Sequence, residues 1–183
     1  MLSQLQIQQC IRREQKALKH CYESCAPYLY TIIKSYIYDE ESRKDLLQES
    51  FAAIFTSLQS YDPSKGHFKP WIAKITVNQC IKQLRAQKKL NFFVPLEGKY
   101  EEHNESDKVI LDQFSRQDML TLLMKMPSGY RTVFVMYIVD GYSHKEIADQ
   151  INISVGTSRS QLNRAIHWIK KHLTKELKMT QNG

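Results

Sequence analysis

Polar side chains near the carboxyl-terminal end of the chain have the types and spacing that recognition of duplex DNA requires. Arginine can bind guanine through two hydrogen bonds, asparagine can bind adenine in the same way, and serine or lysine can contact phosphate. These residue types recur at helical intervals, at Arg159, Ser160, Asn163, Arg164, His167, Lys170 and Lys171. The opposite arc of the same helix is apolar. The pattern predicts one face for a core and one for an anionic partner, although a solvated amphipathic helix has the same outline.

The residues before this helix favour a helix-turn-helix. Ser143 and Glu146 form a capping-box pattern, which starts a short helix. Asn152 tolerates the left-handed conformation that ends a helix, and Ser154 can cap the next one, with Thr157 in its first turn. In such a motif the second helix enters a major groove. The sequence therefore predicts a module that reads duplex DNA.

A second basic region lies in the first half of the chain. Residues 65–89 include seven basic residues and no acidic one: Lys65, Lys69, Lys74, Lys82, Arg85, Lys88 and Lys89. Tyr61, Phe68 and Trp71 lie within or beside this stretch. A protein that binds a single nucleic-acid strand uses cations to contact the phosphate backbone and flat aromatic rings to stack on the unstacked bases. Alternatively, the rings are core residues that anchor the loop over residues 61–69.

The pattern along the chain predicts an all-α fold of two small helical domains. The first domain is expected over residues 1–89, the second over residues 115–178, and a tail over residues 179–183. Residues 90–114 are rich in acidic residues and show little periodicity, which indicates a flexible acidic linker.

Caps and breakers predict where individual helices begin and end. In the first domain we expect one helix over residues 3–19, a second that begins near Pro27, and a third that Ser42 and Asp45 cap. Pro70 suits the first turn of a fourth helix. In the second domain, a helix that opens near Ser115 should stop before Pro127, and the next should run over residues 128–139 to Gly141.

Composition excludes several classes of protein. Lys and Arg number 26 against 19 Asp and Glu, which gives a net charge of +7 and favours an anionic partner. Residues 1–19 lack the apolar core of a signal peptide, and the longest apolar run, residues 133–139, is too short to span a bilayer. We therefore expect a cytoplasmic protein without membrane insertion. The four cysteines lack zinc-type spacing and no catalytic motif is found, so we expect no metal, no cofactor and no enzymatic activity.

Three motifs occur in an order that resembles a known family. They are D-L-L-Q-E-S-F (residues 45–51), F-x-x-W-I-x-x-I-x-x-N (residues 68–78) with Arg85, and G-Y-S-H-K-E-I-A followed by S-V-G-T-S-R-S-Q-L (residues 141–162). Together with the acidic linker, they resemble bacterial RNA polymerase sigma factors of the extracytoplasmic-function (ECF) subfamily. The resemblance covers nearly everything from residue 22 to residue 173.

The resemblance implies three sets of contacts. Core RNA polymerase would be bound by Asp45, Leu47, Gln48, Glu49 and Phe51. The minus-10 promoter element, duplex and melted strand, would be contacted by Tyr61, Lys65, Phe68, Lys69, Trp71, Lys74, Asn78, Lys82 and Arg85. The minus-35 element would be contacted by Thr157, Arg159, Ser160, Asn163, Arg164 and His167. Lys82 departs from the acidic or amide residue that many members carry there, and Asn163 is a variable position, so the promoter sequence cannot be named.

The resemblance also implies an anti-sigma factor as a partner. Two other functions stay open at this point. One is a one-component helix-turn-helix transcription regulator, which would bind duplex DNA without polymerase and carry a ligand-sized apolar pocket in the first half. The other is an adaptor whose helices bind another protein and whose basic charge is incidental.

Overall fold

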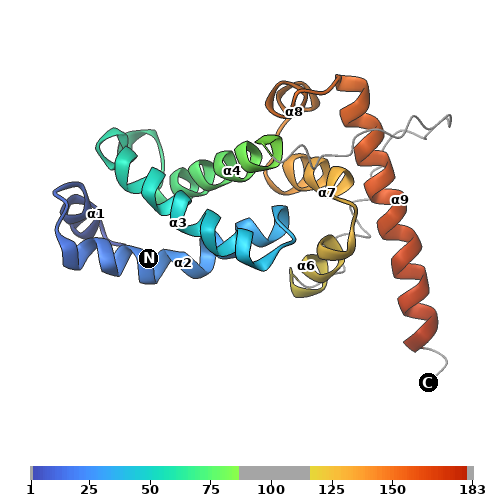
Figure 1. Cartoon of the computed structure of the whole chain (residues 1–183), viewed down its shortest axis with the longest axis horizontal. Helices are drawn as coiled ribbons and strands as arrows, with labels where there is room; N and C mark the ends of the chain where they lie inside the picture. The colour runs from blue at the N-terminus through green and yellow to red at the C-terminus, as the bar shows by residue number, and fades with distance from the viewer. Residues whose placement is uncertain (1, 87–115, 181–183) are drawn as a thin grey trace. The chain divides into compact units, whose positions relative to one another are not determined.

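The computed structural model describes residues 2–86 and 116–180, and every regular element in these two ranges is helical (Figure 1). This confirms the predicted all-α fold. Contacts divide the chain into two compact units, residues 1–83 and 84–183. The acidic linker predicted over residues 90–114 and the end of the tail predicted over residues 179–183 lie outside the described residues.

The amino-terminal part forms two helices, so the prediction of one helix over residues 3–19 is wrong. Helix α1 (Gln4–Ile11) begins with a capping box in which Ser3 and Gln6 exchange hydrogen bonds. It ends because Arg13 adopts a positive φ of 60°, which reverses the chain before α2 (Gln15–Tyr36). Sequence periodicity alone does not register a single left-handed residue between two helical segments.

Helix α2 runs through Pro27, so the prediction that a helix begins near this residue is also wrong. Proline in a helix interior removes one backbone donor. The helix tolerates this lost donor because Pro27 is on its exposed side. The Thr31 hydroxyl donates a hydrogen bond to the Pro27 carbonyl at 2.9 Å. The buried side of α2 supplies Cys21, Cys25 and Leu29 to the core.

Helix α3 (Glu40–Ser57) begins earlier than predicted, because Asp39 caps it by accepting from the Ser42 amide at 2.8 Å. The predicted cap formed by Ser42 and Asp45 is therefore wrong. Arg43 is buried beneath the turn before the helix. Its Nε donates to the Ile37 carbonyl at 2.8 Å and its Nη2 donates to the Tyr38 carbonyl. This side chain ties the start of α3 to the end of α2, a role that no sequence pattern indicated.

Two short 3-10 turns, η1 (Leu58–Ser60) and η2 (Pro63–Lys65), connect α3 to α4 (Phe68–Ala86). Pro70 lies in the first turn of α4, as predicted. The core of the first unit joins residues of α1, α2, α3 and α4, namely Ile7, Cys10, Cys21, Cys25, Leu29, Phe51, Ile54, Leu58, Phe68 and Ile72. One apolar cluster therefore fixes α3 and the start of α4 on the two preceding helices.

The second unit contains α6 (Arg116–Lys125), α7 (Ser128–Phe134), a π-helical turn η3 (Val135–Val139), α8 (His144–Ile151) and α9 (Val155–Thr180). Pro127 separates α6 from α7, and Gly141 follows η3 with a φ of 76°. Both terminations are as predicted. Helices α7 and α8 pack against α9, whose apolar side buries Leu162, Ala165, Ile166 and Ile169.

The capping box of α8 gives a first testable prediction. The Ser143 hydroxyl accepts from the Glu146 amide at 3.2 Å, and the Glu146 carboxylate accepts from the Ser143 amide at 2.8 Å. Ser143→Ala should lower the free energy of unfolding by about 0.5–2 kcal/mol, because it removes the acceptor for one unpaired amide. Chemical denaturation measures this loss, and Ser143→Asp, which restores an acceptor, should recover most of it. Equal losses in both variants would contradict the role of the cap.

Candidate nucleic-acid interface

The helix-turn-helix predicted from sequence is present in the second unit. Asn152 ends α8 in the left-handed conformation, with φ 55° and ψ 56°, and Ser154 caps α9 by accepting from the Thr157 amide at 2.9 Å. His144 Nδ1 lies 2.9 Å from the Ser158 hydroxyl, and Ser158 is fully buried. This bond joins the first turn of α8 to the first turns of α9. It fixes the orientation of the second helix relative to the first.

The His144 ring has a second contact, with Tyr137. The two rings stack at a centroid distance of 4.4 Å. Sequence reasoning did not identify His144 or Tyr137, because their contact joins η3 to α8 and follows no helical spacing. A His on a helix followed fourteen residues later by a Ser carries no recognisable pattern.

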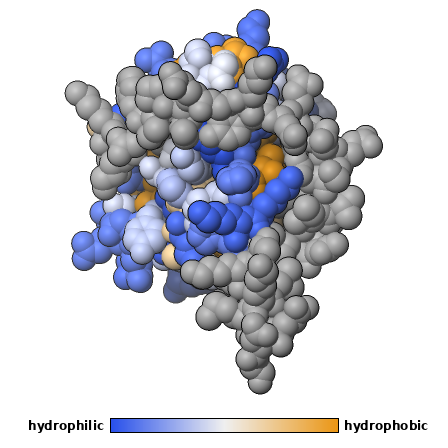
Figure 2. Space-filling view, turned by 90° about the vertical axis from the view of Figure 1, so that its right-hand side faces the viewer, coloured by the Kyte–Doolittle hydropathy of each residue, from blue (hydrophilic) through white to orange (hydrophobic). Residues whose placement is uncertain are grey.

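The polar face of α9 is narrower than predicted. Arg159 and His167 are exposed, and so are Lys170 and Lys171, while Thr157, Ser160 and Asn163 are half-buried. Arg164, however, is only 6% exposed, so its expected place on the exposed arc is wrong, while its contact with the minus-35 element stays a prediction. Its position lies at the edge between the two arcs of the helix, where the 100° rule does not decide burial. Hydrophilic residues dominate the described part of the surface that Figure 2 shows.

The aromatic residues of the first unit form a cluster. Ring centroids of Tyr61 and Phe68 lie 5.2 Å apart, those of Tyr61 and Trp71 5.3 Å, and those of Phe68 and Trp71 5.7 Å. Phe68 is buried, whereas Tyr61 and Trp71 are half-buried. The burial of Phe68 fits the alternative in which this ring anchors the loop, and its contact with the minus-10 element stays a prediction. Tyr61 and Trp71 retain accessible surface.

Exposed basic side chains occur beside this cluster and further along α4. Lys65, Lys69, Lys74, Lys82, Arg85 and Asn78 are all exposed. The Lys69 ammonium lies 4.4 Å from the centroid of the Tyr28 ring, a cation–π contact. The part of the basic run at residues 87–89 lies outside the described residues. The described cations present positive charge along the loop and the length of α4.

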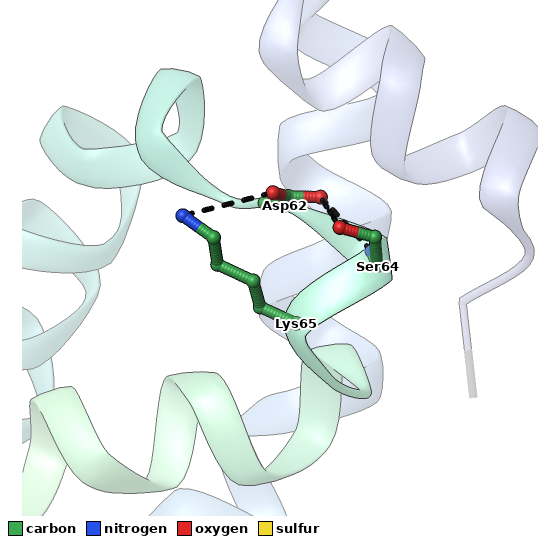
Figure 3. A network of polar contacts seen from close by, with 3 residues as sticks. All are labelled: Asp62, Ser64 and Lys65. Carbon is green, nitrogen blue, oxygen red and sulfur yellow. Dashed lines mark hydrogen bonds and ion pairs between the residues drawn. The ribbon is translucent and has the colours of Figure 1, made fainter.

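One acidic residue organises the loop before α4 (Figure 3). The Asp62 carboxylate accepts from the Ser64 hydroxyl at 2.7 Å and from the Ser64 amide at 2.9 Å, and it lies 3.8 Å from Lys65 Nζ. The hydroxyl bond, with the amide bond, lowers the pKa of Asp62 below its ordinary value. The two hydrogen bonds from Ser64 therefore stabilise the ionised carboxylate of Asp62, and the exposed Lys65 ammonium lies within ion-pair distance of it.

The face of α3 predicted to bind a protein partner is mostly accessible. Asp45, Gln48 and Glu49 are exposed and Leu47 is half-buried. Phe51 is only 2% exposed and its ring lies 4.5 Å from that of Tyr22 and 5.6 Å from that of Phe55. Phe51 therefore packs behind the exposed face in the free chain, and its contact with the polymerase stays a prediction.

Two negative observations concern the described residues only. Within them, no group of three His, Cys, Asp or Glu side chains is placed to hold a metal ion. No helix in the same ranges is long and apolar enough to cross a membrane.

The described residues form a capped helix-turn-helix and a separate basic module, an arrangement typical of DNA-binding proteins. Comparison with known proteins specifies the family. The family model "Sigma-70 region 2" matches residues 21–90, and the model "Sigma-70, region 4" matches residues 116–168. The chain belongs to the sigma-70 family of RNA polymerase sigma factors, within the ECF subfamily.

Curated relatives agree with this assignment. The chain is 24% identical to the ECF RNA polymerase sigma factor SigW of Bacillus subtilis, over 94% of this chain and 97% of SigW. It is 29% identical to SigM of the same organism, over 78% of this chain and 86% of SigM. It is 26% identical to SigE of Mycolicibacterium smegmatis over 75% of this chain, but spans only 54% of SigE. A solved structure of CnrH in complex with the cytosolic domain of CnrY matches at 20% identity with a TM-score of 0.49, over 93% of this chain and 96% of that chain.

Proposed function

We propose that this sigma factor binds core RNA polymerase through α3 and directs transcription initiation through two DNA-binding modules. The observation that carries the proposal is the joint presence of the two sigma-70 regions in one chain, in the order region 2 then region 4. Residues 1–89 would form the module for polymerase and the minus-10 element, and residues 115–178 the module for the minus-35 element. The first unit does contain the ligand-sized apolar pocket that a one-component regulator would carry. The regulator is nevertheless not favoured, because it accounts for only the second of these regions.

The second module would bind duplex DNA through the exposed side of α9. Arg159 and His167 project from this side, and the half-buried Thr157, Ser160 and Asn163 lie beside them. Arginine and asparagine supply hydrogen bonds to base edges, and the hydroxyl groups supply bonds to phosphate. Arg164 would support α9 from its buried position and would not contact a base. The contact between His144 and Ser158 would set the angle at which α9 enters the groove.

The first module would open and hold the minus-10 element. Separating the strands costs a few kcal/mol per base step, which capture of a base and of the backbone can offset. The exposed Lys69, Lys74 and Lys82 would bind phosphates, and Asn78 and Arg85 would lie along the same strand. Tyr61 and Trp71 offer the ring surface that remains accessible, with Phe68 anchoring both from below.

The catalyst in this reaction would be the polymerase, and this chain would contribute binding energy alone. Asp45, Gln48 and Glu49 present an acidic and polar face that suits a basic partner surface. The protein would act where the polymerase is, in the cytoplasm. An anti-sigma factor that covers one of these surfaces would hold the protein inactive, and the support for this partner is membership of the ECF subfamily.

Transcription from a library of random promoters tests the proposed function. Purified core polymerase with the protein should produce start sites that are absent without it, and these promoters should share two spaced sequence elements. Sequencing of the transcripts measures both outcomes. The matched control is the same reaction with the Arg159→Ala variant, which should retain polymerase binding but lose starts that depend on the upstream element. Duplex binding by the chain without any protein-dependent start would overturn the proposal and favour a regulator.

A further inference from the structure

Three of the four cysteines lie together in the core of the first unit. Cys10 and Cys21 have no exposed surface, and Cys25 is 9% exposed. Cys10 Sγ donates to the Ala17 carbonyl at 3.3 Å, and the Cys21 thiol hydrogen-bonds with both Cys10 and Cys25. The sulfurs therefore form a chain that runs from α1 into α2 and ends at Cys25. Neither the fold nor the proposed function requires polar thiols in this row.

The hydrogen bond between Cys21 and Cys25 gives the two thiols different acidities. It lowers the pKa of Cys25 to about 7, against the opposing effect of burial, because the Cys21 thiol stabilises the Cys25 thiolate. The same bond, followed by burial, raises the pKa of Cys21 far above its ordinary value. Burial also raises the pKa of Cys10. Of the three thiols in this cluster, Cys25 is therefore the one whose pKa lies below its ordinary value.

Cys25 also lines a cavity. The cavity has a volume of about 730 Å³, within the range of about 300–1,000 Å³ typical of small-molecule sites. Its wall is largely apolar and comes from α1, α2, the loop before α4 and the start of α4, including Leu2, Ile7, Pro63, Phe68, Pro70 and Ile72. The titratable groups on the same wall are Tyr28, Tyr61, His67 and Lys69. The cavity therefore brings a nucleophilic sulfur and an apolar binding surface together.

We propose that Cys25 is a covalent modification site for small, uncharged, apolar electrophiles that carry a conjugated carbonyl group and enter this cavity. The largely apolar wall favours an uncharged reagent, and the volume of about 730 Å³ is large enough to hold one. Cys10 and Cys21 lie behind Cys25 and are closed to such a reagent.

The reaction is an addition that balances without an oxidant. The Cys25 thiolate forms a carbon–sulfur bond to the β-carbon of the conjugated system, and the carbon–carbon π bond breaks. The electron pair moves to the carbonyl oxygen as an enolate, which takes a proton from water and returns to the ketone or amide form. The thiol proton has already passed to solvent, so no leaving group is produced.

A disulfide between Cys21 and Cys25 is a less suitable product. The two residues lie one helical turn apart on α2, where Cβ atoms are about 5–6 Å apart. A disulfide requires a Cβ separation of about 3.5–4.5 Å. Its formation would distort the middle of α2, whereas an adduct leaves the helix intact.

Modification would act on promoter opening, and this consequence rests on the proposed function. Tyr61, Phe68 and Lys69 form part of the cavity wall and belong to the minus-10 module. An adduct on Cys25 fills the space beneath them and limits how the loop can move around a separated strand. The polymerase-binding residues on α3 do not line the cavity, so binding to the polymerase should continue.

Competition between the four thiols in the native full-length protein tests the modification site. We expect N-ethylmaleimide at pH 7 to label Cys25 at least about five times faster than Cys80, as measured by peptide mass spectrometry over time, because Cys80 is fully buried and is not in the cluster. The rate at Cys25 should rise as pH increases through about 7 and level off above it, since only the thiolate reacts. Cys80→Ser should leave this rate unchanged, and Cys21→Ser should slow it at pH 7. Equal labelling of Cys25 and Cys80 would overturn the proposal.

Transcription assays with the labelled protein test the consequence separately. We expect labelled protein to bind core polymerase normally but to lose at least about fivefold in transcription from a duplex promoter, with recovery on a promoter that is already melted at the minus-10 element. Cys25→Ser and Cys25→Ala, which no reagent can modify at this position, should stay active after treatment. Undiminished transcription from fully labelled protein would overturn the inhibitory role. Failure of the unlabelled protein to support transcription would contradict the proposed function, while the labelling result would still decide whether Cys25 is the site.

Discussion

Alanine at position 159 is expected to weaken binding to duplex DNA carrying the minus-35 element by about 5- to 150-fold, equal to about 1–3 kcal/mol. Arg159 is exposed on α9, and a bidentate arginine contact to a base is worth this amount. The effect should fall on the cognate duplex rather than on all sequences, because the lost contact reads a base. Fluorescence anisotropy with cognate and scrambled duplexes at one fixed salt concentration measures the difference.

Arg164→Ala is the matched control for this prediction. It removes the same charge five residues later on the same helix, but from a side chain that is only 6% exposed. Its main effect should be on stability, through lost packing and lost polar contacts, with a lower midpoint in thermal unfolding. Arg159→Ala should leave that midpoint unchanged. If the two variants have the same thermal midpoint and lose the same DNA affinity, Arg164 reads DNA directly and its buried position is not the one that binds.

Reversing charge on the exposed face of α3 is expected to abolish polymerase binding almost completely. Asp45→Lys combined with Glu49→Lys replaces two carboxylates with two ammonium groups on a face that we propose meets a basic surface. Placing like charges opposite each other costs several kcal/mol, so affinity for core polymerase should fall by at least about 100-fold. Competition with a labelled sigma factor for core polymerase measures the loss.

The control for the α3 variant makes the same change of charge elsewhere in the first unit. Glu14→Lys combined with Glu23→Lys alters two exposed carboxylates on or beside α2. This variant should bind polymerase as the unaltered protein does. Equal loss of binding in both would show that net charge, and not the α3 face, determines the interaction.

Local chemistry made the second unit predictable from sequence. The capping box at Ser143 and Glu146, the left-handed Asn152 and the cap at Ser154 each act within three or four residues, so each can be recognised along the chain. The apolar arc of α9 was also predictable, because helical periodicity places Leu162, Ala165, Ile166 and Ile169 together.

The errors arose where tertiary contacts override local preference. Pro27 was expected to begin a helix, but α2 continues through it because its opposite side is fixed in the core by Cys21, Cys25 and Leu29. A sequence pattern does not show whether the burial of one side of a helix stabilises it more than the loss of one backbone hydrogen bond destabilises it.

Some features of the candidate sites had no sequence pattern at all. Arg43 binds two carbonyl groups of the preceding turn, and His144 binds Ser158 across the helix-turn-helix. The cavity beside Cys25 is built from α1, α2 and the loop before α4, which meet only in three dimensions. Residues with such roles can be found only after the helices have been placed.

Gly141 and Asn152, the two positive-φ residues that flank α8, share one restriction on mutation. At Gly141, with φ 76°, an added Cβ atom would meet nothing within 4 Å. The handedness of the backbone, and not a lack of space, therefore restricts this position to glycine and the few residues that accept a left-handed conformation. Because Asn152 already adopts such a conformation at φ 55°, evolution can exchange asparagine and glycine between the two positions at small cost. A β-branched residue at either position would be strained by the left-handed backbone, and at Gly141 this holds although nothing lies within 4 Å of an added Cβ atom.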